Sequence, residues 1–103
     1  MKIYQEQGIG TEKDIRSGTI GSYFYISSAE ILPESYSKPG ALSLGLARFT
    51  NIREAKYHYE IRKELQDEFL SDMNIKEGKI EKLVGKRVVG FYRNKKVGRI
   101  GII

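Results

Sequence analysis

The stretch ALSLGLARF, residues 41–49, alternates between large apolar side chains and small or polar ones. Leu42, Leu44 and Leu46 fall on one face of an extended chain, and a serine and a glycine lie between them on the other face. Strict alternation of this kind is typical of an antiparallel strand that has one buried face. The stretch therefore predicts a strand whose leucines point into a hydrophobic core.

A second extended segment precedes this strand, at Ser22–Leu32, with the sequence SYFYISSAEIL. It is rich in β-branched and aromatic residues, and the loop PESYSKPG separates it from the leucine-rich stretch. Phe24 and Ile26 share one face of this segment, whereas Tyr23 and Tyr25 share the other. We therefore expect two neighbouring strands with Phe24 and Ile26 in the core and the two tyrosines outside.

The next segment is the one part of the sequence with a helical period, and it predicts one amphipathic helix at about residues 51–73. Asn51 and Glu54 have the spacing of a capping box at the start of a helix. Residues 55–60 also alternate like a strand and contain two tyrosines, so either structure fits them. The predicted apolar stripe of the helix consists of Ala55, His58, Ile61, Leu65, Phe69 and Met73.

The chain continues to the stretch GKRVVGFYRNKKVGRIGII, which alternates again and predicts strands at about residues 86–93 and 96–102. Asn94 and Lys95 would form the turn, because asparagine tolerates the left-handed backbone of a tight hairpin. Simple alternation places one apolar face in the core and leaves glycines on an open face, around one aromatic ring and one guanidinium. The predicted core face contains Val89, Phe91, Ile100 and Ile102, and the predicted open face contains Val88, Gly90, Tyr92, Val97, Arg99 and Gly101.

The elements follow one another in the order β-β-α-β-β, which indicates an α+β protein. With 103 residues, the chain is long enough for a single domain, residues 1–103, around one core. Elements of this kind form a small antiparallel β-barrel, or a strongly curled sheet packed on the helix. Residues 1–20 are rich in glycine and polar side chains, so we expect a weakly structured arm with a short strand at Lys2–Gln5.

Positive charge is concentrated toward the C-terminal end. Residues 1–78 contain ten Lys and Arg against twelve Asp and Glu, whereas residues 79–103 contain eight Lys and Arg and a single acid. Such crowding is unfavourable unless an anionic partner neutralises it, and nucleic acid combines phosphates with bases that stack on aromatic rings. We therefore predict a surface that binds single-stranded DNA or RNA, with Lys86, Arg87, Arg93, Lys95, Lys96 and Arg99 on phosphates and Tyr23, Tyr25 and Tyr92 as stacking planes.

Each of these features also has an ordinary structural explanation. A basic hairpin can simply be a solvated surface, and exposed tyrosines are common on strands. Glycine within a strand often marks a bulge. A second function fits the same charge, namely a small viral or regulatory interaction module whose basic hairpin binds an acidic protein. In that case the apolar end of the chain could pair edge to edge with a partner or with a second copy.

Other classes of protein find little support in the sequence. It contains no cysteine and a single histidine, His58, so neither a thiolate metal site nor a histidine cluster can form, and we expect no cofactor. No motif for nucleophilic catalysis or nucleotide binding is present, so we expect a protein that is not an enzyme. The sequence has neither a long apolar run nor a signal-peptide core, and we expect an intracellular protein.

Two stretches resemble a known family. Residues 20–49, IGSYFYISSAEILPESYSKPGALSLGLARF, contain a strand that begins near a Gly-x-Tyr, a polar loop that ends in glycine, and a leucine-alternating strand. Residues 69–92, FLSDMNIKEGKIEKLVGKRVVGFY, lead from a helix through a polar connector into Leu83, Gly85, Lys86 and Val88, a Leu-x-Gly-Lys-x-Val pattern. These stretches resemble phage-type single-stranded DNA-binding proteins with an OB fold. The resemblance implies a five-stranded OB-like barrel, aromatic and basic contacts with a single strand, and a role in viral or prophage replication and recombination.

Overall fold

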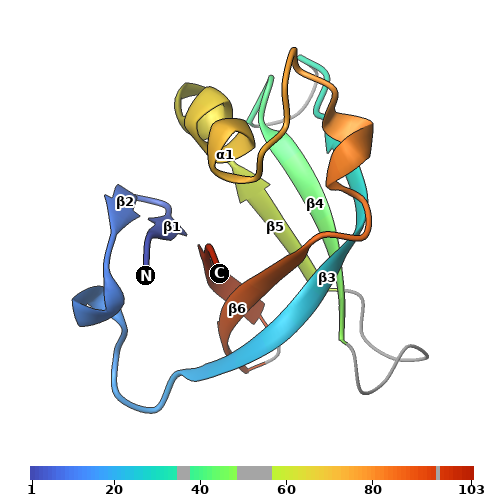
Figure 1. Ribbon diagram of the computed structural model, residues 1–103. Coiled ribbons are helices and arrows are strands. Elements are labelled where there is room, and N and C mark those ends of the chain that lie inside the picture. Colours follow the sequence, from blue (N-terminus) through green and yellow to red (C-terminus); the bar gives the residue numbers. More distant parts are fainter. Residues whose placement is uncertain (35–37, 49–56, 95) are drawn as a thin grey trace.

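The computed structural model describes residues 1–34, 38–48, 57–94 and 96–103. Within them, seven strands form one antiparallel sheet with the spatial order β2-β1-β7-β6-β3-β4-β5 (Figure 1). The strands are β1 (Ile3–Gln5), β2 (Gly8–Gly10), β3 (Ile20–Ile31), β4 (Leu42–Arg48), β5 (Tyr57–Ile61), β6 (Arg87–Arg93) and β7 (Lys96–Gly101).

A helical segment lies at one end of the sheet, where β5 ends (Figure 1). The 3-10 turn η2 (Lys63–Leu65) continues directly into the α-helix α1 (Gln66–Asp72), whose Phe69 and Leu70 are buried. Two further 3-10 turns are η1 (Glu12–Asp14) and η3 (Ile80–Leu83). The predicted α+β class is confirmed. None of the helices in the described part of the chain is long and apolar enough to cross a membrane.

The long strand β3 organises the sheet because it pairs with two neighbours. Its first half pairs with β6 and its second half with β4, and a register shift between Ile26 and Ser28 interrupts the ladder with β4. Such irregularities bend a strand and increase its twist. As predicted, the core contains the side chains of Phe24, Ile26, Leu42, Leu44 and Leu46, all of which are completely buried.

The helix predicted at about residues 51–73 is wrong over Tyr57–Ile61, which form strand β5 and pair with β4, the alternative that also fitted residues 55–60. Tyr57 and Ile61 are buried whereas His58 and Glu60 are exposed, so the two-residue period and the pairing with β4 prevail over the helical period. His58 therefore lies on the surface instead of on an apolar helix stripe. The expected capping box, within residues 51–56, falls outside the described residues.

The C-terminal hairpin forms as predicted, but its faces differ from the prediction. Asn94 adopts the expected left-handed backbone with a φ of 50°, and Arg93 pairs with Lys96. The register then shifts between Phe91 and Tyr92, so that Phe91 lies opposite Arg99 and Gly98 has no opposite residue. An extra residue of this kind is a β-bulge, and it moves the residues beyond it to the other face.

The bulge and the packing of Phe24 place the predicted open face of β6 inside the protein. Val88 is completely buried, and Tyr92 is half-buried and packs on the core. A Cβ atom on Gly90 would lie 2.6 Å from two carbons of the Phe24 ring, so Gly90 also faces inward. Conversely, Phe91 faces outward, where its ring covers Gly101, which we expected on the open face, and also Gly21 of β3.

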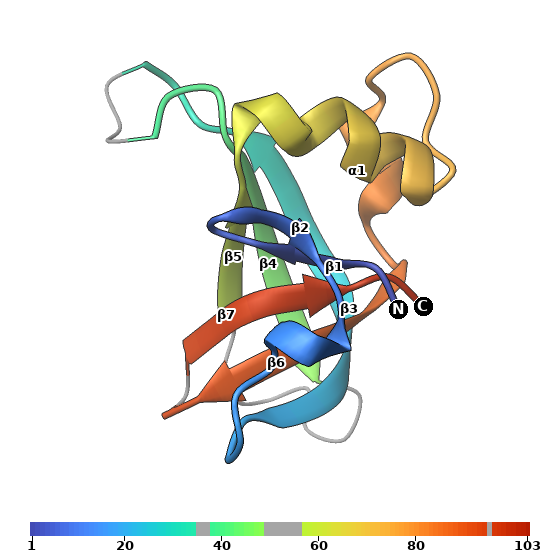
Figure 2. The same cartoon turned by 90° about the vertical axis from the view of Figure 1, so that its left-hand side faces the viewer.

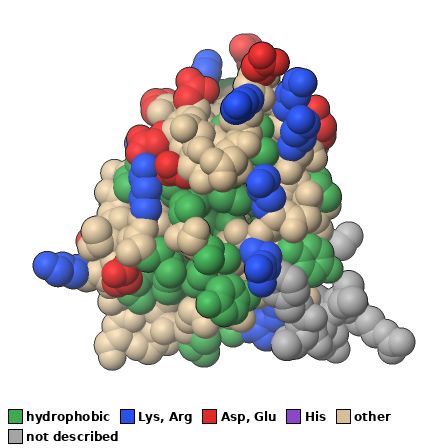
Figure 3. Space-filling view, viewed as in Figure 1, with side chains coloured by type: hydrophobic (Ala, Val, Ile, Leu, Met, Phe, Trp, Pro, Cys, Tyr) green, Lys and Arg blue, Asp and Glu red, His purple; other side chains and the backbone are tan. Residues whose placement is uncertain are grey.

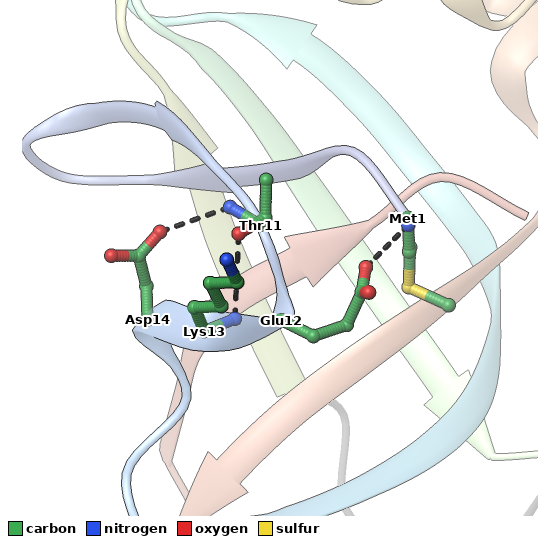
Figure 4. A network of polar contacts seen from close by, with 5 residues as sticks. All are labelled: Met1, Thr11, Glu12, Lys13 and Asp14. Atoms are coloured by element: carbon green, nitrogen blue, oxygen red, sulfur yellow. Dashed lines mark hydrogen bonds and ion pairs between the residues drawn. The ribbon is translucent and has the colours of Figure 1, made fainter.

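The N-terminal segment differs from the weakly structured arm that we expected. β1 pairs with both β2 and β7, Ile3 and Tyr4 are buried, and Figure 2 shows the two chain ends close together. The turn η1 begins with a capping box, in which the Thr11 amide donates to Asp14 Oδ2 at 2.9 Å (Figure 4). An ion pair joins the α-amino group of Met1 to Glu12.

A polar cluster ties this N-terminal segment to α1. The Tyr4 hydroxyl donates to Asp72 Oδ2, and Lys2 Nζ forms ion pairs with Asp72, at 2.9 Å, and with Glu68. Burial raises the pKa of Asp72, but the hydrogen bonds from Tyr4 and Lys2 outweigh it and hold this pKa below its usual value of 3.8. The cluster therefore stabilises the folded state as long as Asp72 is ionised.

We expect this cluster to make the protein sensitive to acid. A carboxyl group with a lowered folded-state pKa contributes stability above its ordinary pKa and loses it as the pH falls through the folded value. The free energy of unfolding of the wild type should thus decrease below about pH 4. In Asp72→Asn this part of the decrease should be absent, as measured by urea unfolding between pH 2 and 6. Equal acid sensitivity of the two proteins would contradict the assignment.

Backbone pairing does not join β5 to β2 or to any other strand at the far edge of the described sheet. The strand pairing therefore does not establish the closed barrel that we expected. The open edges of the sheet are β2 and β5, and β7 lies between β1 and β6. The apolar chain end GRIGII thus does not offer the free edge that pairing with a partner would need.

Candidate functional site

A groove lies between β5 and β7. It has a volume of about 220 Å³, and Tyr59 of β5 and Gly98 of β7 lie on its two sides. Two side-chain hydrogen bonds join this part of the chain to the N-terminal hairpin: the Tyr59 hydroxyl donates to the Tyr4 carbonyl at 3.3 Å, and Arg62 Nη1 donates to the Glu6 carbonyl at 3.0 Å. We call this hollow the seam groove.

Basic side chains reach the seam groove from separate parts of the chain. Lys38 comes from the loop between β3 and β4, Arg62 follows β5, and Lys96 begins β7. A second hollow of about 370 Å³ shares Lys38 and Arg62 with it and adds Lys63. Across both hollows these four cations face three carboxylates, which belong to Glu6, Glu60 and Glu64. The groove therefore combines a modest positive charge with a hollow shape.

Gly98 has no side chain, so the groove is open to solvent at this point of β7. A Cβ atom placed on Gly98 would meet no atom within 4 Å, and Gly98 itself is exposed. Tyr59 is half-buried, and burial together with the negative charge of Glu6 raises its pKa to about 12, although Arg99 and Arg62 act in the opposite direction. The phenol is therefore neutral at physiological pH and lines the groove as an aromatic, hydrogen-bonding wall.

The structure distributes the predicted binding residues over several surfaces. Lys96 lines the seam groove, whereas Lys86 and Arg87 line a different hollow beside the end of α1. The Arg99 Nε donates to Gln5 Oε1 at 2.7 Å, so it points along the outer face of the sheet toward β1. Arg93 is exposed beside the turn of the hairpin, and Lys95 falls outside the described residues.

The three predicted stacking tyrosines do not share a face. Tyr23 is 59% exposed on the outer face of β3, opposite Val89, and Tyr25 is half-buried on the same face. Tyr92 points to the other side of the sheet, into the core. The expected platform of one tyrosine and one arginine on a glycine floor is therefore wrong for Tyr92 and Arg99.

The structure instead brings Tyr92 together with Arg48, a residue that the sequence did not single out. The Arg48 Cζ lies 4.8 Å from the ring centroid of Tyr92, 5.7 Å from that of Tyr57 and 5.9 Å from that of Phe24. Arg48 Nη2 also donates a hydrogen bond to the Tyr92 hydroxyl. We call these four residues the Arg48 cage. Its members come from four strands, so no local sequence pattern could have revealed it.

Apolar side chains lie in and beside the hollow that Lys86 and Arg87 line, which also contains Asp72 and Asn74. Ile102 and Ile103 line this hollow of about 330 Å³, with Met73 at the end of α1, and the neighbouring Val84 is 52% exposed. Figure 3 shows hydrophobic side chains gathered across the middle of one face, with acidic side chains over the helical segment above them.

Within the described residues, no group of three or more His, Asp or Glu side chains is placed to hold a metal ion. No protein-family model matches the sequence, and neither a curated protein nor a solved structure matches the chain.

Proposed function

We propose that this protein binds single-stranded nucleic acid, DNA or RNA, along the seam groove and that it is not an enzyme. The observation that carries the proposal is the convergence of Lys38, Arg62 and Lys96 on one hollow that also contains an aromatic wall and an open glycine. Basic side chains can follow the phosphates of a strand while a base contacts the ring, and such contacts depend little on sequence.

The strand order supports this proposal. We infer that β3, β4, β5, β6 and β7 form an OB-like barrel, since they lie in the order β5-β4-β3-β6-β7 and the helical segment connects β5 to β6. OB folds bind oligonucleotides on their second and third strands and through the loops between strands 1 and 2 and strands 4 and 5. Here β4 and β5 are the second and third strands of the five.

The positions of two lysines agree with that arrangement. Lys38 belongs to the loop between β3 and β4, the first and second strands, and Lys96 follows the turn between β6 and β7, the fourth and fifth. Both line the seam groove, with β5 beside them. If these strands form an OB-like barrel, the groove lies on its ligand surface. The groove also unites elements that are distant in sequence.

We expect binding to weaken strongly with salt. If all four cations of the two hollows contact phosphates, the logarithm of the association constant should fall with a slope of roughly −3 against the logarithm of salt concentration. Fluorescence anisotropy with labelled oligothymidylate and oligouridylate between 50 and 500 mM salt measures this slope. Absence of binding at the lowest salt concentration, or affinity independent of salt, would refute the proposal.

Matched charge variants separate the groove from general positive charge. The double variant Lys38→Gln/Lys96→Gln should lose about half of the salt slope, because it removes two of the four phosphate contacts. Lys76→Gln/Lys79→Gln removes the same charge from an exposed turn after α1 and should bind like the wild type. Equal losses in the two double variants would show that binding depends on net charge alone.

Filling the groove gives an independent check. Gly98→Leu places a side chain in open space above the bulge, so it should reduce affinity by about tenfold or more without lowering the unfolding temperature. If a folded Gly98→Leu protein keeps the wild-type affinity, the nucleic acid binds elsewhere on the protein.

A second candidate function is favoured by the apolar surface beside the end of α1. Val84 and Ile103 are both more than half exposed, and Lys86 and Arg87 border the same hollow. Exposed apolar side chains with a charged rim are common where proteins bind other proteins. An interaction module for an acidic protein would use this surface, and it would leave oligonucleotide affinity undetectable at every salt concentration.

A further inference from the structure

Carboxylates line the seam groove together with its cations. Glu6, from the turn between β1 and β2, borders both this groove and the neighbouring hollow, and Glu60 of β5 borders the groove. A carboxylate repels the phosphates that Lys38 and Lys96 would attract, so it is unfavourable in a groove that binds phosphates alone. The part of the groove beside these carboxylates is therefore suited to a different part of the ligand.

The side chain of Glu6 is exposed, and its acceptor oxygens are available to a ligand. Arg62 Nη1 donates to the backbone carbonyl of Glu6 at 3.0 Å, and Arg62 Nε lies 3.8 Å from Glu64 Oε2. In the part of the chain that the structure describes, neither an ion pair nor a hydrogen bond engages the Glu6 carboxylate itself. An ionised carboxylate is an acceptor only, so the ligand group that it binds must carry N–H or O–H donors.

Glu6 lies close to the aromatic wall of the groove. Burial is the first cause of the raised pKa of Tyr59, and the negative charge of Glu6 is the second, which places this carboxylate near the phenol. The Tyr59 hydroxyl also donates to the carbonyl of Tyr4, two residues before Glu6. A planar base that contacts the Tyr59 ring would thus have its edge within reach of the Glu6 carboxylate.

Backbone groups of two strand edges face the same groove. Among the described strands, β5 pairs only with β4, and β7 pairs with β1 only from Arg99 onward. Successive residues of a strand direct their N–H and C=O groups to alternate sides, so part of the backbone of residues 58–60 and 96–98 points away from its paired neighbour. These donors and acceptors suit the edge of a base, which carries both, better than a phosphate, which offers acceptors only.

We infer that the seam groove holds a base of the bound strand against Tyr59 and that Glu6 accepts a hydrogen bond from the exocyclic amino group of this base. The inference rests on the proposed function and adds a preference to it. Cytosine and adenine carry such an amino group, whereas thymine and uracil carry a carbonyl oxygen at the corresponding position. A carboxylate attracts the amino group and repels the carbonyl oxygen, so the groove should prefer cytosine and adenine.

A pair of matched oligonucleotides tests this preference. Oligodeoxycytidylate and oligodeoxyuridylate of equal length have the same sugar and the same charge, and they differ only in the hydrogen-bonding groups on one edge of the base. We expect the wild type to bind oligodeoxycytidylate about tenfold more tightly, because one well-placed contact with a base edge discriminates by roughly this factor or more. Fluorescence anisotropy at neutral pH and one fixed salt concentration measures both affinities.

Glu6→Gln tests the residue itself. Glutamine keeps the size of the side chain and the backbone carbonyl that Arg62 binds, but it carries a donor beside its acceptor. The preference for oligodeoxycytidylate should therefore disappear, mainly because oligodeoxyuridylate binds more tightly. Glu81→Gln is the matched control, since it removes the same charge from an exposed position of η3 that lines neither hollow. It should change both affinities equally and keep the preference.

The outcomes separate this inference from the proposed function. Equal affinity of the wild type for the two oligonucleotides, or tighter binding of oligodeoxyuridylate, overturns the inference and leaves the proposed function intact, because the strand is still bound. A preference that persists unchanged in Glu6→Gln also overturns it, since another group would then contact the base. If neither oligonucleotide binds at low salt concentration, the proposed function fails, and the inference fails with it.

Discussion

Gly90→Ala should lower the unfolding temperature of this protein by about 10 °C, which corresponds to a loss of about 2 kcal/mol in a domain of this size. The added Cβ atom would lie 2.6 Å from two carbons of the Phe24 ring. Phe24 is completely buried and contacts the rings of Tyr57 and Tyr92, so it cannot move without disturbing the core. Differential scanning calorimetry measures the change.

Gly98→Ala is the matched control for this prediction. It introduces the same methyl group in the neighbouring strand, where no atom lies within 4 Å, and it should leave the unfolding temperature nearly unchanged. The pair of variants distinguishes the observed hairpin from one without a bulge, in which Gly90 would face outward. Equal stability of the Gly90→Ala and Gly98→Ala proteins would contradict the observed packing of β6.

The second large effect is expected in alkali. The pKa of Tyr59 is raised from 10.0 to about 12, mainly by burial, and burial and the hydrogen bond to Asp72 raise the pKa of Tyr4 even further. A group with a raised folded-state pKa contributes its full stability below the unfolded value and loses it as the pH rises through the folded value. The free energy of unfolding should thus fall between pH 10 and 12, by about 3 kcal/mol for Tyr59 alone.

Absorbance at 295 nm and circular dichroism, recorded together during an alkaline titration, measure this effect. We expect Tyr4 and Tyr59 to ionise only when the protein unfolds. Tyr59→Phe should show a smaller loss of stability between pH 10 and 12. Ionisation of every tyrosine near pH 10 with the fold intact would show that Tyr4 and Tyr59 are not held as described.

Alternation in the sequence was sufficient to predict β3 and β4, because each has a single consistent apolar face. Alternation was ambiguous for Tyr57–Ile61, because a helical period and a two-residue period each place apolar residues on one face. Pairing with β4 makes this segment a strand. The stretch Arg87–Arg93 has apolar residues on both faces, so its orientation depends on where the Phe24 ring packs. The position of the bulge at Gly98 is likewise set by tertiary packing, although glycine is a common marker of bulges.

The candidate site was predictable only in its composition. The basic C-terminal hairpin includes Lys96, which lines the seam groove, but Lys38 and Arg62 reach this groove because the sheet brings a distant loop beside β5. The Arg48 cage unites β3, β4, β5 and β6, so no spacing of residues along the chain signals it. Residues that act together across four strands become visible only when the strand order is known.

The pairing of β1 with β7 determines when folding can finish. Ile3 lies opposite Gly101, so β1 cannot complete its pairing before the distant strand β7 has been synthesised. During synthesis, Ile3 and Tyr4 thus lack their neighbours in β7 until that strand has left the ribosome. Contacts between residues so far apart in sequence slow folding. We would accordingly look for chaperone dependence in this nascent chain rather than for early, stepwise folding from its N-terminus.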